Sequence, residues 1–205
     1  MSLIEGKLLH DVVWREAELV NLKAACSQFS AHLPKGKGFR RAYLAMLYAH
    51  YEGFSKFAWE VYLIEISRCG YALSRLQPSL AGIFLASDIT KLRNASADIM
   101  TETVFEFRGR LLDTISATYK PIETSNLWPA VLREVLDRLH VQAGFIDTHE
   151  RALRSLVARR NDIAHGQNVS ITDDNLRVFE EAVWDVFSYL VINISKAYDC
   201  RDFIR

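Results

Sequence analysis

Strong helix breakers are scarce along this chain: nine glycines and four prolines punctuate 205 residues, and the segments between them are long. A protein of many short strands needs frequent turns, which Gly and Pro usually supply. The spacing therefore favours helices. Half of the residues are hydrophobic, enough to bury the core of one domain of this length. We expect a single all-α domain over residues 1–205, built as a bundle of roughly five to seven helices.

Apolar periodicity and end signals locate the expected helices. An N-terminal helix should occupy most of residues 1–36, from about 8 to about 32, before the stretch 33–38 breaks it. The bundle proper then spans residues 39–205. Its expected helices run from about 39 to 69, 79 to 95, 129 to 139, 145 to 164 and 172 to 198, whereas residues 103–107 have the composition of a strand.

Capping residues support three of these helix ends. Asn126 can cap the helix that has Pro129 in its first turn, where the missing N–H of proline is not needed. Gly166 should close the helix over 145–164, and Thr172 can begin the last one.

Two apolar faces should supply much of the core. On the first helix the expected buried face gathers Leu9, Val13, Ala17, Val20 and Ala24. On the second, an aromatic series could stack bases but more often forms core and interface in such helices. It consists of Tyr48, Tyr51, Phe54, Phe57, Trp59 and Tyr62.

Charge, cysteines and motifs exclude several classes of protein. The 25 basic and 25 acidic residues cancel, so nucleic acid binding would need a local patch. The three cysteines form no CxxC pair, and the histidines have no metal-ligand spacing, which leaves free thiols and no metal site. No apolar run reaches the roughly 18 residues of a membrane span and no signal-peptide core is visible, so we expect a cytoplasmic protein. Walker, GxGxxG, GxSxG and HExxH motifs are absent.

One segment combines a buried face with polar groups at the end of a helix. Arg160, Asn161 and His165 follow apolar positions and precede Gly166. Residues five apart on a regular helix point roughly 140° from one another. Arg160 and His165 can therefore meet at one substrate only if the last turn loosens or a second copy of the chain completes the site.

This pattern resembles the Arg-x(4–6)-His motif of HEPN (higher eukaryotes and prokaryotes nucleotide-binding) domains. Asn161 fills the place of the polar residue that typically follows the arginine. Residues 48–56, 124–127 and 156–166 are further similar to a prokaryotic HEPN subgroup of predicted toxins and defence effectors. The resemblance covers residues from about 40 to 200 and is weakest over 71–123.

The resemblance implies a HEPN-like bundle that pairs as a symmetric homodimer, with the two motif helices facing each other. It further implies cleavage of RNA without metal or cofactor, by attack of the ribose 2′-hydroxyl on the adjacent phosphate. Such a protein would act as a toxin or as an antiphage or stress effector. An inhibitory antitoxin, or a neighbouring nucleotidyltransferase-type protein, would hold it silent.

The chemistry of the motif residues suits these roles. Histidine exchanges protons near neutrality, so His165 is the candidate general acid or base. Arg160 stays charged and can fork onto phosphate oxygens, and Asn161 can orient the histidine or bind phosphate.

Five more residues are weaker candidates for the same site. Arg154, Arg159 and Lys56 could contact the RNA backbone, and Glu52 and Asp162 could support the site. Glu52 and Lys56 also suit an i,i+4 structural ion pair.

Non-enzymatic interpretations of the same residues remain. Arg160 and His165 could instead serve the free carbonyls and dipole at a helix C-terminus. The chain could then be a catalytically silent helical adaptor, or a nucleotide-binding regulator.

Overall fold

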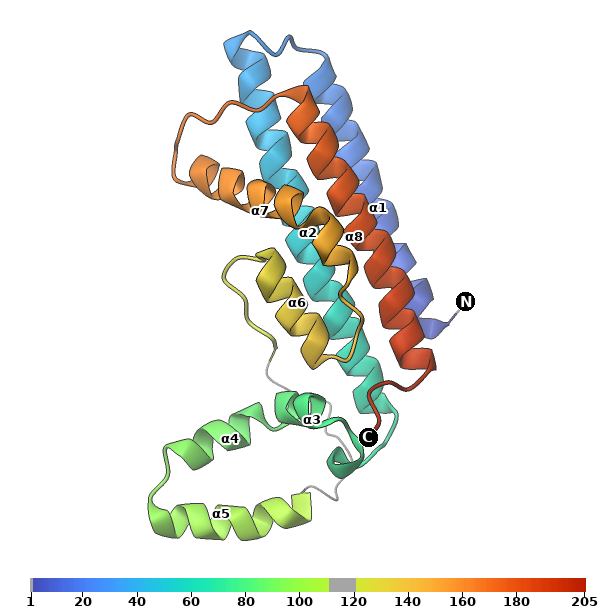
Figure 1. The fold of residues 1–205 in the computed structure, drawn as a ribbon, viewed down its shortest axis with the longest axis vertical. Helices are drawn as coiled ribbons and strands as arrows, with labels where there is room; N and C mark the ends of the chain where they lie inside the picture. The colour runs from blue at the N-terminus through green and yellow to red at the C-terminus, as the bar shows by residue number, and fades with distance from the viewer. Residues whose placement is uncertain (1, 111–120) are drawn as a thin grey trace.

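The computed structural model describes residues 2–110 and 121–205, in which helices are joined by loops and no strand is named (Figure 1). The helices are α1 (Leu3–Ser27), α2 (Pro34–Arg68), α3 (Pro78–Phe84), α4 (Ala86–Arg93), α5 (Ala97–Arg110), α6 (Pro129–Arg138), α7 (Phe145–Ala164) and α8 (Asp173–Asp199), with a 3₁₀ turn at Leu73–Arg75. The all-α prediction is confirmed. None of the described helices is long and apolar enough to cross a membrane.

Five helices form the bundle. The long helices α1, α2 and α8 run side by side, α7 packs across α2 and α8, and α6 packs on α7 (Figure 1). The short helices α3 to α5 lie at one end of this bundle. Because α2 contacts α1, α7 and α8, it is buried on several sides, and its aromatic series is core as expected: Tyr48, Tyr51, Phe54, Trp59 and Tyr62 are fully buried.

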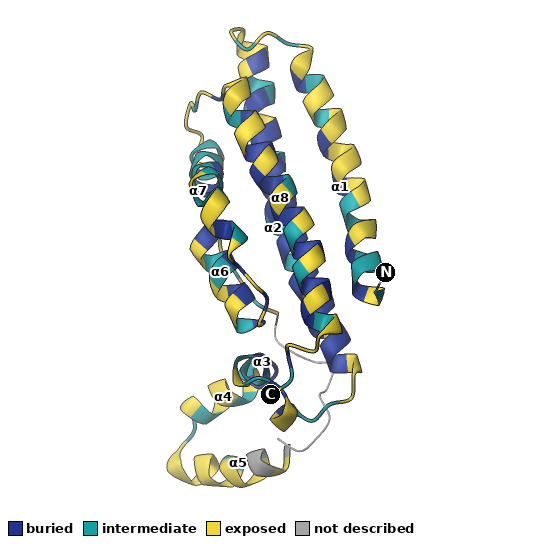
Figure 2. Ribbon diagram, turned by 45° about the vertical axis from the view of Figure 1, so that its right-hand side comes forward, coloured by how far each residue is buried: buried dark blue, intermediate teal, exposed yellow. Residues whose placement is uncertain are grey.

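The outward face of α1 corrects one expectation. Leu9, Val13 and Val20 are 40%, 65% and 56% exposed, and the helix turns this face to solvent (Figure 2). The core instead receives Ile4, Leu8, Leu19 and Cys26, together with the side chain of Arg15.

Arg15 explains why a face with a charged residue can be the buried one. Its Nε donates to Asp11 at 2.6 Å, and its guanidinium lies 4.5 Å from the ring centroid of Trp14. Gly53 of α2 faces it, and an added Cβ there would lie 3.0 Å from Arg15 Nη1. A charged side chain can be buried when it is paired and hydrogen-bonded, as Arg15 is with Asp11. Apolar periodicity alone therefore predicted the wrong buried face for α1.

The break between the first two helices lies earlier in the chain than expected. α1 ends at Ser27, whereas α2 already begins at Pro34 and includes both Gly36 and Gly38. A Cβ on Gly36 would lie 1.9 Å from the carbonyl oxygen of Ser30. This glycine therefore permits a close approach of two backbones and does not break the helix.

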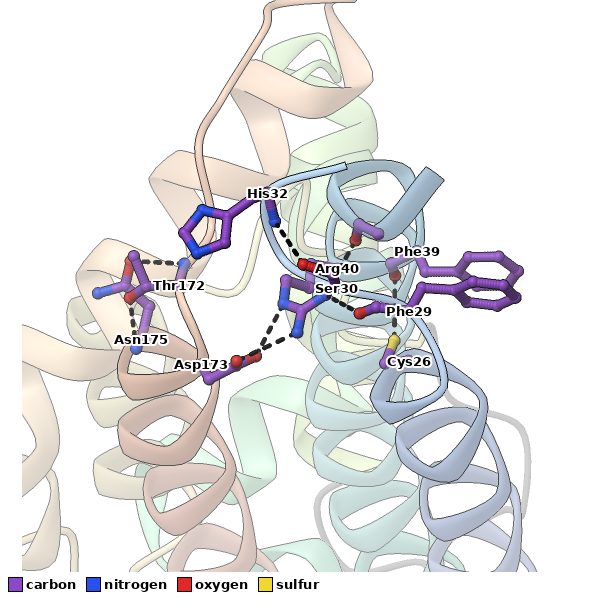
Figure 3. A network of polar contacts seen from close by, with 10 residues as sticks. Cys26, Phe29, Ser30, His32, Phe39, Arg40, Thr172, Asp173 and Asn175 are labelled. Carbon is purple, nitrogen blue, oxygen red and sulfur yellow. Dashed lines mark hydrogen bonds and ion pairs between the residues drawn. The ribbon is translucent and has the colours of Figure 1, made fainter. Parts of the chain in front are cut away.

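Arg40 joins that turn to the start of α8 (Figure 3). Its Nε and Nη2 donate to Asp173 at 2.7 and 3.1 Å, and its Nη1 donates to the carbonyl oxygens of Phe29 and Gly36. Thr172 caps α8 by accepting from the N–H of Asn175, which confirms its predicted role.

Residues 78–110 depart most from expectation. The helix expected over 79–95 is divided into α3 and α4 at Leu85, and the strand-like residues 103–107 lie within α5. The strand prediction is wrong. A strand needs a neighbour for its backbone groups, and residues 2–110 and 121–205 contain no named strand, whereas a helix satisfies its own.

Candidate functional site

The motif helix α7 ends in a regular cap. Leu153, Leu156 and Val157 bury its apolar face. At the end, Gly166 takes a left-handed φ of 76°, and its N–H donates to Ile163 O at 3.0 Å. The N–H of Gln167 reaches back to Asp162 O at 2.9 Å, which completes a Schellman motif. Gly166 thus closes the helix as predicted.

The last turn before His165 is not loosened. The N–H of His165 donates to Asn161 O at 3.0 Å, the i to i−4 bond of an α-helix. Of the two ways in which Arg160 and His165 could meet, the loosened turn is therefore not the one found in this chain.

Arg160 is held by neutral groups. Its Nη1 donates to Asn126 Oδ1 at 3.0 Å and to Asn161 Oδ1 at 2.9 Å. Its guanidinium carbon lies 4.1 Å from the ring centroid of Tyr48. Burial, the largest cause, raises the pKa of Tyr48, so this phenol stays neutral at physiological pH. These contacts differ from the predicted alternative in which Arg160 serves the helix carbonyls.

Glu52 and Lys56 form the predicted ion pair, and they also face the motif. Lys56 Nζ lies 2.9 Å from Glu52 Oε1 and donates to the carbonyl oxygen of Thr124 at 3.3 Å. The other Glu52 oxygen is 3.7 Å from Arg160 Nη2. Because the carboxylate is closer to Lys56, it only partly offsets the charge of Arg160.

Asn126 does not cap α6. That helix begins after Trp128, which makes no side-chain cap bond, and the Asn126 side chain turns to Arg160 instead. Capping rules did not indicate this, because a loop asparagine before a Pro-initiated helix matches a cap signal. The similarity of residues 124–127 to the HEPN subgroup was a signal that could have found it. Tyr48 was also missed as a site residue, since its place in an aromatic series indicated core.

Two residues of the motif segment, His165 and Asp162, have side chains that make no polar contact within the described residues. His165 is exposed, and its side chain has no hydrogen bond or ion pair to any residue in 2–110 or 121–205. The Asp162 side chain is half-buried and likewise makes none within those ranges. The imidazole is therefore free to meet another molecule.

The two flanking arginines lie apart from the contacts around Arg160. Arg159 donates to Ser155 Oγ at 3.3 Å and to Ser170 O at 3.0 Å, so it ties α7 to the segment after the motif. Arg154 is 64% exposed and pairs with Glu150 at 2.7 Å.

The hollow beside Arg40 is a poor alternative site for an anion. It encloses about 390 Å³ between α1, α2 and α8, and each of its three cations is near a carboxylate. The pairs are Lys23 with Glu180 at 2.6 Å, Arg40 with Asp173 at 2.7 Å and Arg177 with Asp174 at 3.9 Å. No group of three potential metal-ligating side chains gathers within the part of the chain that the structure describes.

The described residues form an α-helical bundle, in which Arg160 lies near the end of α7 and the exposed His165 forms the C-cap of that helix. In the comparison with protein families, the HEPN_MAE_28990-like HEPN model matches residues 4–203. The chain belongs to this family, which suggests a nucleotide-binding or ribonuclease-type function. No curated protein and no solved structure matches it.

Proposed function

We propose that the protein is a metal-independent endoribonuclease whose site is shared between two copies of the chain. One observation carries the proposal: Arg160 is held by neutral partners, and His165 follows five residues later, exposed and without a side-chain hydrogen bond or ion pair to residues 2–110 or 121–205.

The charge of Arg160 remains available to a phosphate. Its close contacts are two amide oxygens and an aromatic ring, and its side chain is 29% exposed. Glu52 approaches to 3.7 Å but shares its carboxylate with Lys56. A fixed guanidinium that is not neutralised suits the negative charge that builds up during phosphoryl transfer.

The regular last turn favours a composite site. Because α7 stays α-helical up to His165, the side chains of Arg160 and His165 diverge by roughly 140°. A second copy, with its motif helix facing the first, would bring an arginine and a histidine together. We therefore propose a symmetric homodimer.

The proposed reaction needs only this chain's residues. One His165 takes the proton of the ribose 2′-hydroxyl, and the 2′-oxygen attacks the adjacent phosphorus. The bond to the 5′-oxygen breaks, and a second His165 can protonate that leaving oxygen. The products are a 2′,3′-cyclic phosphate and a 5′-hydroxyl. Arg160, with Asn161 beside it, stabilises the charged phosphoryl oxygens.

We further propose that this activity serves as a toxin or as an antiphage or stress effector. An inhibitory antitoxin, or a nucleotidyltransferase-type protein, would restrain it. The similarity of the motif segments to predicted HEPN toxins supports this role.

Cleavage of total bacterial RNA by purified protein in excess EDTA tests the proposal. We expect discrete fragments from the wild type and a rate lower by at least about 100-fold for His165→Ala, because general acid–base catalysis contributes that much. His10→Ala is the matched control, since His10 is also exposed. Cleavage by neither wild type nor variant, from an intact dimer, would favour the silent adaptor.

A further inference from the structure

The loop over residues 124–128 is fastened to α2 by three side chains. Tyr48 Oη accepts from the N–H of Leu127 at 3.0 Å, and Tyr51 Oη donates to Leu127 O at 3.1 Å. Lys56 donates to Thr124 O. Leu127 itself is fully buried. Two buried phenols thus hydrogen-bond the backbone N–H and C=O of Leu127, which holds this segment in one position on the bundle.

This fastening sets the position of Asn126, the residue next to Leu127. The Asn126 amide oxygen accepts from Arg160 Nη1, and the ring of Tyr48 lies against the same guanidinium. Tyr48 therefore contacts the loop with its hydroxyl and Arg160 with its ring. From this we infer that Asn126 and Tyr48 are positioning residues that fix the guanidinium of Arg160, which makes the 124–128 loop part of the site.

The inference rests on the proposed function for its effect on RNA cleavage. Asn161 belongs to α7, so on its own it cannot fix the arginine relative to α2. Asn126 and Tyr48 supply that link from outside α7, and both are neutral. They can thus restrict the guanidinium without neutralising it, which lowers the reorganisation needed when phosphate charge develops.

Four variants distinguish the effect of a disordered Arg160 guanidinium from the effect of a neutralised one. Asn126→Ala removes the acceptor, and Tyr48→Leu removes the aromatic ring. Tyr48→Phe keeps the ring and loses only the hydroxyl. Asn126→Asp keeps an acceptor near the guanidinium but adds a negative charge. Asn193→Ala is the matched control, because Asn193 is also half-buried and makes one side-chain hydrogen bond, to Tyr189 O at 2.9 Å.

The first measurement is ¹⁵N NMR relaxation of the Arg160 Nε–H group, assigned with Arg160→Lys. It needs no enzymatic activity. We expect a restricted guanidinium in the wild type, Asn126→Asp and Asn193→Ala, and a mobile one in Asn126→Ala and Tyr48→Leu. Tyr48→Phe should be intermediate, because it keeps the ring but loses the hydrogen bond that holds Leu127 beside Asn126. Equal mobility in wild type and Asn126→Ala would overturn the inference, whether or not the protein cleaves RNA.

The second measurement is the rate of RNA cleavage. We expect kcat to fall about 10–100-fold in Asn126→Ala with KM little changed, because the arginine loses alignment more than affinity. Asn126→Asp should also be slow although its guanidinium is ordered, since its carboxylate neutralises the charge. Wild-type kcat in Asn126→Ala would overturn the positioning role. Absence of cleavage by the wild type would count against the proposed function, and the NMR result would then decide the inference.

Discussion

Two arginines of this chain, Arg40 and Arg160, are held by side chains from different helices but differ in what surrounds their charge. The side chain of Arg40 is 6% exposed, and Asp173 accepts from two of its nitrogens. Its third nitrogen, Nη1, donates to the backbone carbonyl oxygens of Phe29 and Gly36. The side chain of Arg160 is 29% exposed, and its closest partners are neutral.

The difference separates an arginine with a structural role from the arginine that we propose to act in catalysis. The charge of Arg40 is neutralised at hydrogen-bond distance, and its donors close the junction of α1, α2 and α8 (Figure 3). Among the described residues, no carboxylate lies at hydrogen-bond distance from Arg160, since Glu52 lies at 3.7 Å and is paired with Lys56. If burial and the number of hydrogen bonds alone were compared, Arg40 would be the better candidate for a site residue. The charge of the hydrogen-bond partners points to Arg160 instead, because its partners are neutral.

The largest effect should come from Arg160→Ala. We expect RNA cleavage to fall about 10²–10³-fold, as for loss of one transition-state donor, with the free energy of unfolding changed by only about 1 kcal/mol. Arg160→Lys should not restore the rate, because an ammonium cannot fork onto phosphate. Arg133→Ala, which breaks an exposed pair with Asp147, is the control. If Arg160→Ala cleaved RNA at the wild-type rate, the proposed difference in role between Arg40 and Arg160 would be wrong.

Arg40→Met should show the reverse pattern. The variant leaves the carbonyls of Phe29 and Gly36 without their donor, so we expect the free energy of unfolding to fall by about 1.5–3 kcal/mol. Urea denaturation measures this. Cleavage at a temperature where the variant is folded should match the wild type, and a 100-fold loss there would contradict the structural assignment of Arg40.

Gly36→Ala tests the same junction through its backbone. The added Cβ would lie 1.9 Å from Ser30 O, and backbone must move, so we expect a loss of about 1–3 kcal/mol in the free energy of unfolding. Gly38→Ala meets nothing within 4 Å and should instead stabilise α2 by about 0.5–1 kcal/mol. Equal effects of the two changes would show that the close approach does not exist.

The smallest expected effect is on the stability of the fold at acidic pH. The hydrogen bond from Arg40 lowers the pKa of Asp173 below its ordinary value of 3.8. The pair should therefore stabilise the folded state fully above that value, and lose its contribution as pH falls through the lowered pKa. Because Asp173 is mostly exposed, we expect no more than about 1 kcal/mol. Asp173→Asn should flatten the loss of stability in acid more than Asp174→Asn does, and identical acid profiles would argue against the pair.

Local rules were sufficient where a helix end or a packed face depends on nearby residues. Gly166 closes α7 through the left-handed φ that glycine tolerates, and Thr172 caps α8 through its own hydroxyl. The aromatic series of α2 is buried except for Phe57, which is half-buried, as the large apolar surface of these side chains favours. The Arg160–His165 motif, together with the similar segments 48–56, 124–127 and 156–166, also indicated the family that the family model shows.

Local rules failed where the choice depended on a neighbour. The outer face of α1 also carries a regular apolar pattern, whereas the buried face includes Arg15, for which Gly53 on α2 leaves room. Residues 103–107 formed a helix although their composition suits a strand. Propensity yields to the hydrogen bonds that the surroundings can offer.

The sequence by itself determined the all-helical class, the HEPN motif and the caps at Gly166 and Thr172, because periodicity, spacing and capping act over a few residues. Only the tertiary structure decided which charged side chains are neutralised. Arg40 meets a carboxylate 133 residues away, whereas Arg160 meets Asn126 at a separation of 34 residues and the ring of Tyr48 on another helix. Electrostatic environment depends on distance in space, and no local pattern encodes that distance.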